Sequence, residues 1–325
     1  MRLTPLPKLI RFLTAAASLA LAPHAGAVNC VVSAAPAPFA MGNYTVLAQV
    51  TNNVTITLAC TKTASAEGAV TWRLRLDTGS TSGAGGFGNR TMFNGGNALL
   101  FNIYTTAAFA TIWGDTTGGT VQFTGTFNFT AGAAGVGQTL STAQTGFGRI
   151  VASQDLNAGN YATTTAITIS ARVPNAGGGT TYTNTFNSSA VIPQNCLIDS
   201  ATTLGFGTYD PSSVANVDVN SAMSYRCTKT TPYTISLSTG AGTFASRKMD
   251  SAGANTDQLS YNLYTTTGRT IVWGDGTGGT GTVAGTGAGI LPAAAVNQSL
   301  FGRLFSGQDM TSDIYSDTIT ITATY

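Results

Sequence analysis

The chain has 325 residues, of which 43% are hydrophobic and only 9% are charged, and 15 basic residues against 13 acidic ones give a formal net charge of +2. Such a chain lacks the basic surface that nucleic acids and anionic lipids require. Its length allows two domains of ordinary size, and one histidine and one glutamate leave little for general acid–base catalysis.

The N-terminal 27 residues have the features of a secretory signal peptide. Three basic residues precede an apolar stretch of about eleven residues, 12–22, and an Ala-Gly-Ala cleavage site occupies 25–27. The stretch is too short to cross a bilayer core of roughly 30 Å as a helix. We therefore expect residues 1–27 to be removed and the mature protein to begin at Val28. Because three of the 15 basic residues and none of the 13 acidic ones would leave, its net charge would be −1. We expect no membrane span.

Four cysteines remain in the predicted mature chain: Cys30, Cys60, Cys196 and Cys227. An even number of cysteines in an exported protein favours disulfides. The first two are 30 residues apart and the last two 31, whereas about 140 residues separate the groups. We therefore expect one bridge within each half, each contributing roughly 3 to 4 kcal/mol. The alternative, a metal site, needs close ligand pairs such as C-x-x-C.

The second half of the chain repeats the first half in the same order. The pair Asn29-Cys30 returns as Asn195-Cys196, and the stretch 60–63, Cys-Thr-Lys-Thr, returns at 227–230. Further matched segments are 74–79 with 235–240, 101–106 with 261–266, 113–115 with 273–275, and 147–149 with 301–303. The sequence therefore predicts a tandem duplication, with domains at 28–192 and 193–325.

Both copies have the pattern of β-strands. In the stretch 319–325 the odd positions are apolar or aromatic and the even positions are all threonine, and similar alternation marks 54–58, 72–76, 167–173 and 233–237. No segment keeps a helical apolar period for ten residues, and 39 glycines disfavour long helices. We predict an all-β protein with two tandem β-sandwiches of about seven strands each.

The combined motifs resemble the spore coat protein U family, which includes subunits of Csu-type archaic chaperone–usher pili. They are the Asn-Cys start, the strand 101–106, the Trp-Gly-Asp turn at 113–115, the Phe-Gly-Arg strand at 147–149 and the final Thr-Ile-Thr-Ile run. The resemblance implies incomplete immunoglobulin-like domains that lack a last strand, which a neighbour's N-terminal extension supplies. It also implies three partners: a periplasmic chaperone, an outer-membrane usher and an adjacent pilin.

The two copies differ at their ends. The first copy continues after Val173 through a glycine-rich turn into a segment at about 180–192, whose side chains Tyr182, Phe186, Ala190 and Ile192 share one face. We interpret this segment as the missing last strand, supplied by the same chain, with a polar linker as the alternative. The second copy has no such segment, so it should accept a donor strand along an edge formed by Ile319, Ile321, Ala323 and Tyr325.

Only Val28 and Asn29 precede Cys30 in the predicted mature chain, too few to form a strand for donation. A subunit that accepts a strand but donates none belongs at the distal end of a fibre. The sequence therefore predicts an adhesive tip subunit, exported through the periplasm to the cell surface. The alternative is a structural coat or matrix protein without an adhesive role.

A tip subunit would expose its first domain, so loops that differ between the copies are candidate binding surfaces. The turn Ala107, Ala108, Phe109 and Ala110 is apolar, whereas its counterpart at 267–270 is Thr-Gly-Arg-Thr. The family's tip adhesins are similar in using hydrophobic loops to grip abiotic surfaces. Loops around Phe87 and Phe93 and at 131–136 are also apolar. For each phenylalanine the alternative is core packing.

Several motifs carry no chemistry in our interpretation. The glycines at 274, 276 and 279 fit G-x-G-x-x-G, but no helix pattern follows them. Asp115 and Asp275 are better explained as turn residues, and Trp113 and Trp273 as core residues, because both copies contain them. Arg247, beside Lys248, would be part of a solvated pair. We expect no enzyme activity, no cofactor and no metal.

Overall fold

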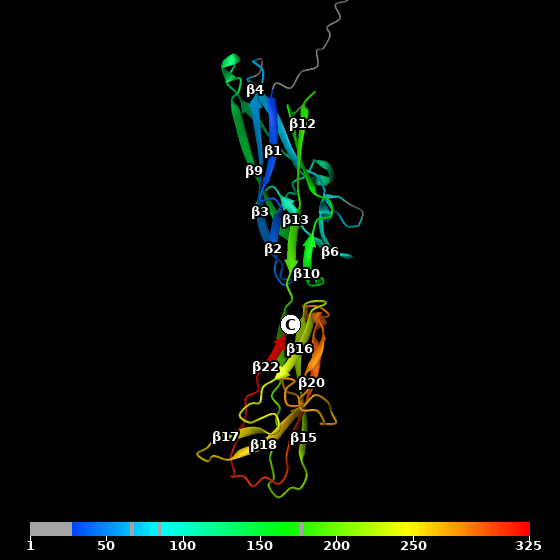
Figure 1. Ribbon diagram of the computed structural model, residues 1–325, viewed down its shortest axis with the longest axis vertical. Coiled ribbons are helices and arrows are strands. Elements are labelled where there is room, and N and C mark those ends of the chain that lie inside the picture. The colour runs from blue at the N-terminus through cyan, green and yellow to red at the C-terminus, as the bar shows by residue number, and fades with distance from the viewer. Residues whose placement is uncertain (1–27, 66–67, 84–85, 176–177) are drawn as a thin grey trace, which may run out of the picture.

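The computed structural model describes residues 28–65, 68–83, 86–175 and 178–325, so the predicted signal peptide lies outside the described residues. Two β-domains follow one another along the long axis of the molecule, joined near residues 193–195 (Figure 1). The predicted all-β, immunoglobulin-like fold is confirmed. Among the described residues, no helix has the length and apolar character needed to cross a membrane.

The first domain arranges its strands in three sheets with the orders β1-β3-β9-β7, β12-β11-β4-β8 and β2-β13-β10-β5-β6. Three short 3-10 turns lie in its loops, η1 (Phe87–Asn89), η2 (Thr117–Gly119) and η3 (Ala133–Gly135). The strands are β1 (Val28–Ala35), β2 (Phe39–Asn43), β3 (Val50–Lys62), β4 (Ala69–Leu76), β5 (Thr91–Asn94), β6 (Asn97–Leu100), β7 (Asn102–Tyr104), β8 (Phe123–Asn128), β9 (Thr139–Ile150), β10 (Gly159–Ala162), β11 (Ile167–Val173), β12 (Thr180–Phe186) and β13 (Ser188–Ile192).

The second domain has two sheets, with the orders β14-β15-β20-β18-β17-β21 and β19-β16-β22. One 3-10 turn, η4 (Pro292–Ala294), precedes β20. The strands are β14 (Cys196–Ala201), β15 (Val217–Cys227), β16 (Pro232–Leu237), β17 (Arg247–Ser251), β18 (Gln258–Tyr264), β19 (Val283–Thr286), β20 (Val296–Leu304), β21 (Tyr315–Ser316) and β22 (Ile321–Thr324).

Strand β3 illustrates how the alternating sequence builds the core. Val54, Ile56 and Leu58 are fully buried, whereas the threonines between them face the opposite side of the sheet. Each domain has its own hydrophobic core, and the tryptophans at 113 and 273 are fully buried at equivalent places. The interpretation of both tryptophans as core residues is therefore confirmed.

Each domain also contains one disulfide. Cys30 is bonded to Cys60 and Cys196 to Cys227, with Cα atoms 4.0 and 4.1 Å apart. Each bridge joins the first strand of its domain to the next long strand, because β1 pairs with β3 and β14 pairs with β15. These are the two bridges that the cysteine spacing predicts.

The Trp-Gly-Asp turns have the same hydrogen bonds in both domains. Asp115 Oδ1 accepts the backbone N–H of Thr117 at 2.9 Å and its hydroxyl at 2.6 Å, and Asp275 accepts the same two bonds from Thr277 at the same distances. A Cβ atom on Gly114 would lie only 2.4 Å from the hydroxyl of a nearby threonine. Both aspartates are therefore turn residues, as the sequence predicts.

Among the described residues, each domain has a fully buried arginine whose hydrogen-bond acceptors are backbone carbonyls and an asparagine amide. Arg90 donates to Asp77 O at 2.6 and 3.1 Å, to Asn102 Oδ1 at 3.0 Å and to Trp113 O at 2.9 Å. Burial lowers the pKa of Arg90 to about 9, so the guanidinium remains charged at neutral pH. Arg247 is fully buried in the same way, which corrects the prediction of a solvated pair with Lys248. Its acceptors are Ser238 O, Asn262 Oδ1 and Trp273 O.

Candidate functional site: an open groove in the second domain

The second domain contains a groove of about 880 Å³. One wall is the segment 201–209, which follows β14 and belongs to no sheet beyond residue 201. The other wall is formed by 310–319 and Ile321. The floor is apolar and comes from β15, β16, β17, β18 and β20; its residues are Met223, Leu237, Met249, Leu259, Tyr261, Leu263, Leu300 and Leu304.

The first domain fills the equivalent space with its own strands. Strand β13 lies between β2 and β10, parallel to the former and antiparallel to the latter. The N–H groups of Phe39 and Tyr44, at the two ends of β2, donate to Asn187 O and Val191 O, both at 2.7 Å. The side chains of Phe186 and other inward-facing residues of this segment then cover the core.

Strand β12 closes the same space further up the first domain. All seven of its residues pair with β11, from Thr180 opposite Val173 to Phe186 opposite Ile167. On its other side it reaches β1 through side chains, because the Tyr182 hydroxyl donates to Val28 O at 2.8 Å and Asn184 Nδ2 to Val32 O at 2.9 Å. Of the predicted self-complementing residues, Phe186, Ala190 and Ile192 are buried and Tyr182 is half-buried.

The walls of the groove correspond to strands that are paired in the first domain. The Tyr315 hydroxyl donates to a carbonyl four residues earlier at 2.8 Å, as the Tyr161 hydroxyl does, so β21 corresponds to β10. A Cβ atom on Gly302 would contact Leu204 and Phe206, as one on Gly148 would contact the first and third residues of β2. The segment 204–206 therefore corresponds to β2, and no strand lies between the two walls in the described residues.

Polar groups at the groove are largely satisfied by one another. The Tyr261 hydroxyl donates to Asp317 Oδ2 at 2.6 Å, and burial, followed by this hydrogen bond, raises the pKa of Tyr261. Asp313 accepts bonds from the Ser251 hydroxyl, from Gly253 N–H at 2.8 Å and from an asparagine amide. The described residues contain no cluster of three potential metal ligands. The groove therefore offers apolar contacts and unpaired strand edges.

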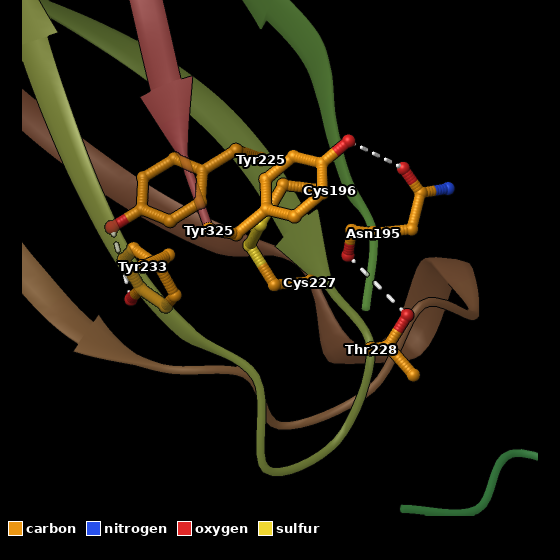
Figure 2. Close-up of a disulfide and its surroundings, with 7 residues drawn as sticks. All are labelled: Asn195, Cys196, Tyr225, Cys227, Thr228, Tyr233 and Tyr325. Carbon is orange, nitrogen blue, oxygen red and sulfur yellow. Dashed lines mark hydrogen bonds between the residues drawn. A yellow bond between two sulfur atoms is a disulfide. The ribbon is translucent and has the colours of Figure 1, made fainter. Parts of the chain in front are cut away.

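Two of the four predicted edge residues, Ile319 and Ile321, line the groove. Ala323 packs against the core of the domain. Tyr325 does not line the groove, because it lies past the end of β22 beside the Cys196–Cys227 disulfide, where its hydroxyl donates to Asn195 Oδ1 at 3.2 Å (Figure 2). The opposite wall, 201–209, is not among the sequence predictions, although the Leu-Gly-Phe alternation at 204–206 indicates it.

The predicted binding loops have a mixed outcome. Phe87 is only 8% exposed and packs on the Arg90 guanidinium, so it is a structural residue and the prediction of a surface role is wrong. Phe93 is half-buried in the β5–β6 hairpin, opposite Ala98. Phe109 is also half-buried, with its ring 5.4 Å from that of Tyr104 and 5.0 Å from the Arg149 guanidinium. Exposed neighbours on this turn are Ala107, Ala108 and Ala110.

The β8–β9 loop lies at the end of the first domain far from the second domain, which we call the upper pole (Figure 1). Val136 is 48% exposed there, and three alanines of the loop are also exposed. Beneath the loop, the Lys62 side chain is buried, and its ammonium donates to Thr130 O at 2.7 Å and Gly132 O at 3.2 Å. The loop is therefore fixed from inside by a lysine.

The lysine that corresponds to Lys62 has a different partner. Lys229 follows the second cysteine of its domain by two residues, as Lys62 does, but its ammonium donates to Asp155 O of the first domain at 2.7 Å. Close by, the Thr228 N–H donates to Asn195 O at 2.8 Å and fixes the segment between the domains. The Thr228 hydroxyl donates to the same oxygen at 3.3 Å (Figure 2). The upper pole of the second domain is thus occupied by the first domain.

Comparison with known proteins identifies the family. The Spore Coat Protein U domain matches the chain twice, at residues 15–168 and 182–322. Protein U of Myxococcus xanthus is 38% identical over 160 residues, which are 45% of this chain and 86% of that protein.

Solved structures also match, and one of them has a similar fold. The CsuC–CsuE chaperone–tip adhesion subunit complex of Acinetobacter baumannii matches with a TM-score of 0.51 and 17% identity over 91% of this chain and 100% of that chain. The CupB6 tip adhesin of Pseudomonas aeruginosa matches with a TM-score of 0.36 and 10% identity over 92% and 96%. From the domain match and the Protein U relative together, the chain belongs to the spore coat protein U family.

Proposed function

We propose that this protein is the tip subunit of a chaperone–usher surface fibre, joined to the fibre by a donor strand that enters the groove of the second domain. The observation that carries the proposal is the contrast between the domains. The first domain is closed by its own β12 and β13, whereas the equivalent space in the second domain is open and apolar. An extended peptide with alternating apolar side chains would pair with both walls of the groove and cover its floor.

The upper pole of the first domain also supports a position at the end of the fibre. In the second domain Lys229 bonds the neighbouring domain, whereas its counterpart in the first domain, Lys62, is buried and bonds the β8–β9 loop. Because Lys62 is bonded to that loop, it is not free to hold a neighbouring domain as Lys229 does. The fibre would thus continue from the second domain, with the first domain exposed to the surroundings.

The same arrangement suggests where adhesion occurs. We propose that the exposed apolar loop 131–136, at the upper pole, contacts abiotic or host material. The turn with Ala107, Ala108 and Ala110 lies near the opposite end of β9, beside Arg149, and would be a second, separate contact. Phe109 supports that turn through its contact with Arg149. Small apolar side chains on a fixed loop lose little entropy on contact with a hydrophobic surface.

An open apolar groove also requires protection before assembly, because exposed strand edges promote aggregation. A periplasmic chaperone would occupy the groove until an outer-membrane usher exchanges it for the strand of the adjacent pilin. Export through the periplasm also agrees with the two disulfides. The proposed role is binding, without catalysis.

The test is thermal unfolding of residues 28–325, purified from a periplasm, with and without synthetic N-terminal peptides of co-assembled pilins. A peptide at 100 times its dissociation constant should stabilise the second domain by about 2.7 kcal/mol and leave the first domain unchanged. The control is the same peptide with its apolar positions replaced by aspartate. Absence of binding by every pilin peptide would contradict the proposal.

The similarity to Protein U and the family description favour a second candidate, a secreted coat component without an adhesive role. This candidate predicts that the second domain is stable without any added strand. It also predicts that cells lacking the protein attach normally to plastic, whereas loss of a tip adhesin should reduce attachment.

A further inference from the structure

The two domains are held together by more than the segment 193–195. Lys229 Nζ donates to Asp155 O at 2.7 Å, and Lys229 O accepts the Ala158 N–H at 2.9 Å. Asp155 Oδ1 accepts the Ile290 N–H at 3.3 Å, and the Ile290 side chain is buried in the core of the first domain. The lower end of the first domain is therefore seated on the upper end of the second (Figure 1).

The first domain builds this lower pole from the loops after β2 and β9. The Tyr44 hydroxyl accepts the Gln154 N–H at 2.9 Å, and the Gln154 side chain bonds the backbone N–H and C=O of Leu100 at 2.7 and 2.8 Å. These bonds fix the loop that presents Asp155. Leu47, from the other loop, lines a small cavity at the domain junction.

The second domain has the same construction at its own lower pole, where nothing is seated among the described residues. Gln308 N–H donates to the Tyr209 hydroxyl at 2.7 Å, and the Gln308 side chain bonds the N–H and C=O of Ser260 at 2.6 and 2.9 Å. The preceding residue, Gly307, has a φ of 70°, and its counterpart Ser153 has the same value. The loops after β9 and β20 therefore share this residue's conformation and the same glutamine hydrogen bonds.

At the lower pole of the second domain, which we call the second pole, the residues that correspond to Asp155 and Leu47 are exposed. Asp309 occupies the position of Asp155 and faces solvent. Val214 precedes β15 by three residues, as Leu47 precedes β3, and it is 95% exposed whereas Leu47 is 50% exposed. The docking residues of the first domain thus have counterparts in the second domain that no described residue covers.

We propose that this second pole, formed by Tyr209, Val214, Gln308 and Asp309, is the docking surface for the body of the next fibre subunit. The occupant would be a domain of the same fold, with a lysine two residues after its second cysteine. The chain direction at the first joint supports this assignment, because β13 runs to the lower pole and Cys196 follows only four residues after its end. A donor strand lying in the groove in the same direction would bring its own domain to Asp309. This inference rests on the proposed function.

A photo-crosslinker tests the contact in assembled fibres. Val214→p-benzoylphenylalanine should crosslink the adjacent subunit within the segment around its second cysteine, as mapped by mass spectrometry. The control is Ile271→p-benzoylphenylalanine, on an exposed hairpin of the same domain, which should give no such product. If the chain is incorporated into fibres but residue 214 gives no crosslink to that segment, the docking surface is refuted and the tip function stands. If the chain is absent from fibres, both are refuted.

A second measurement uses the angle between the second domain and the next subunit in electron micrographs. Asp309→Ala should widen the distribution of this angle, because the aspartate would fix the neighbour as Asp155 fixes residue 290. Asp210→Ala removes the same charge at the same pole and should leave the distribution unchanged. Equal distributions for Asp309→Ala and the unmodified protein would overturn the proposal.

Discussion

Removal of one side chain from the closing strand of the first domain should destabilise that domain selectively. Phe186 is 3% exposed, and its ring meets that of Phe39 edge to face with centroids 6.4 Å apart. Phe186→Ala should lower the free energy of unfolding by about 3 to 5 kcal/mol. A domain of this size loses about 2 to 4 °C of melting temperature per kcal/mol, so a decrease of about 6 to 20 °C is expected.

Calorimetry of residues 28–325 measures this change, provided that the two domains give separate transitions. The first-domain transition should move and the second-domain transition should stay, because Phe186 belongs to the core of the first domain alone. The control is Val191→Ala in β13, since Val191 faces outward and is 37% exposed. A decrease for Phe186→Ala no larger than that for Val191→Ala would refute the view that β12 and β13 complete this sandwich.

Three further changes test other parts of the structure. Burial raises the pKa of Tyr161 to about 12, so the folded state holds this proton more tightly than the unfolded state. The free energy of unfolding should therefore fall as the pH rises from about 10 to 12. Tyr161→Phe should make this fall shallower in alkaline denaturation curves. Lys62→Met would leave Thr130 O without its ammonium donor, and hydrogen exchange in the β8–β9 loop should accelerate. The double substitution Cys196→Ser with Cys227→Ser should lower second-domain stability by about 3 to 4 kcal/mol in urea titrations.

The parts that the sequence predicts well are those that depend on alternation within a segment or on a spacing repeated in both halves. Alternation of threonine with apolar residues marks the strands, and the repeated spacing of Cys30 with Cys60 fixes the disulfides. The glycine-rich turn after Val173 makes β12 recognisable as an added strand. The strands and the turn follow from adjacent residues, and the disulfides follow from a cysteine spacing that both halves share.

The parts that the sequence predicts poorly depend on contacts between distant segments. Arginine is usually a surface residue, but the hydrogen-bond acceptors of Arg247 come from residues nine to 26 positions away, which only the folded sandwich brings together. One signal was available, because Arg-x-Met occurs at both Arg90 and Arg247 in a chain with few charges. Phe87 was misassigned for the same reason, since the arginine that covers it is buried by the fold.

The joint between the domains explains why one chain would contain two copies of a subunit-like unit. Strands β12 and β13 precede Cys196 in the sequence, as a donor extension precedes the first cysteine of a separate subunit. On the proposed function, the chain is equivalent to a tip subunit fused to the next subunit of the fibre. The donor strands of that second unit, β12 and β13, are part of the same chain and therefore cannot dissociate. The hydrogen bond from Lys229 to Asp155 O adds a non-covalent contact between the domains to that covalent connection. A load applied to the adhesive loops would therefore reach the fibre through the second domain, whose groove and lower pole are the first places where separate chains must hold together.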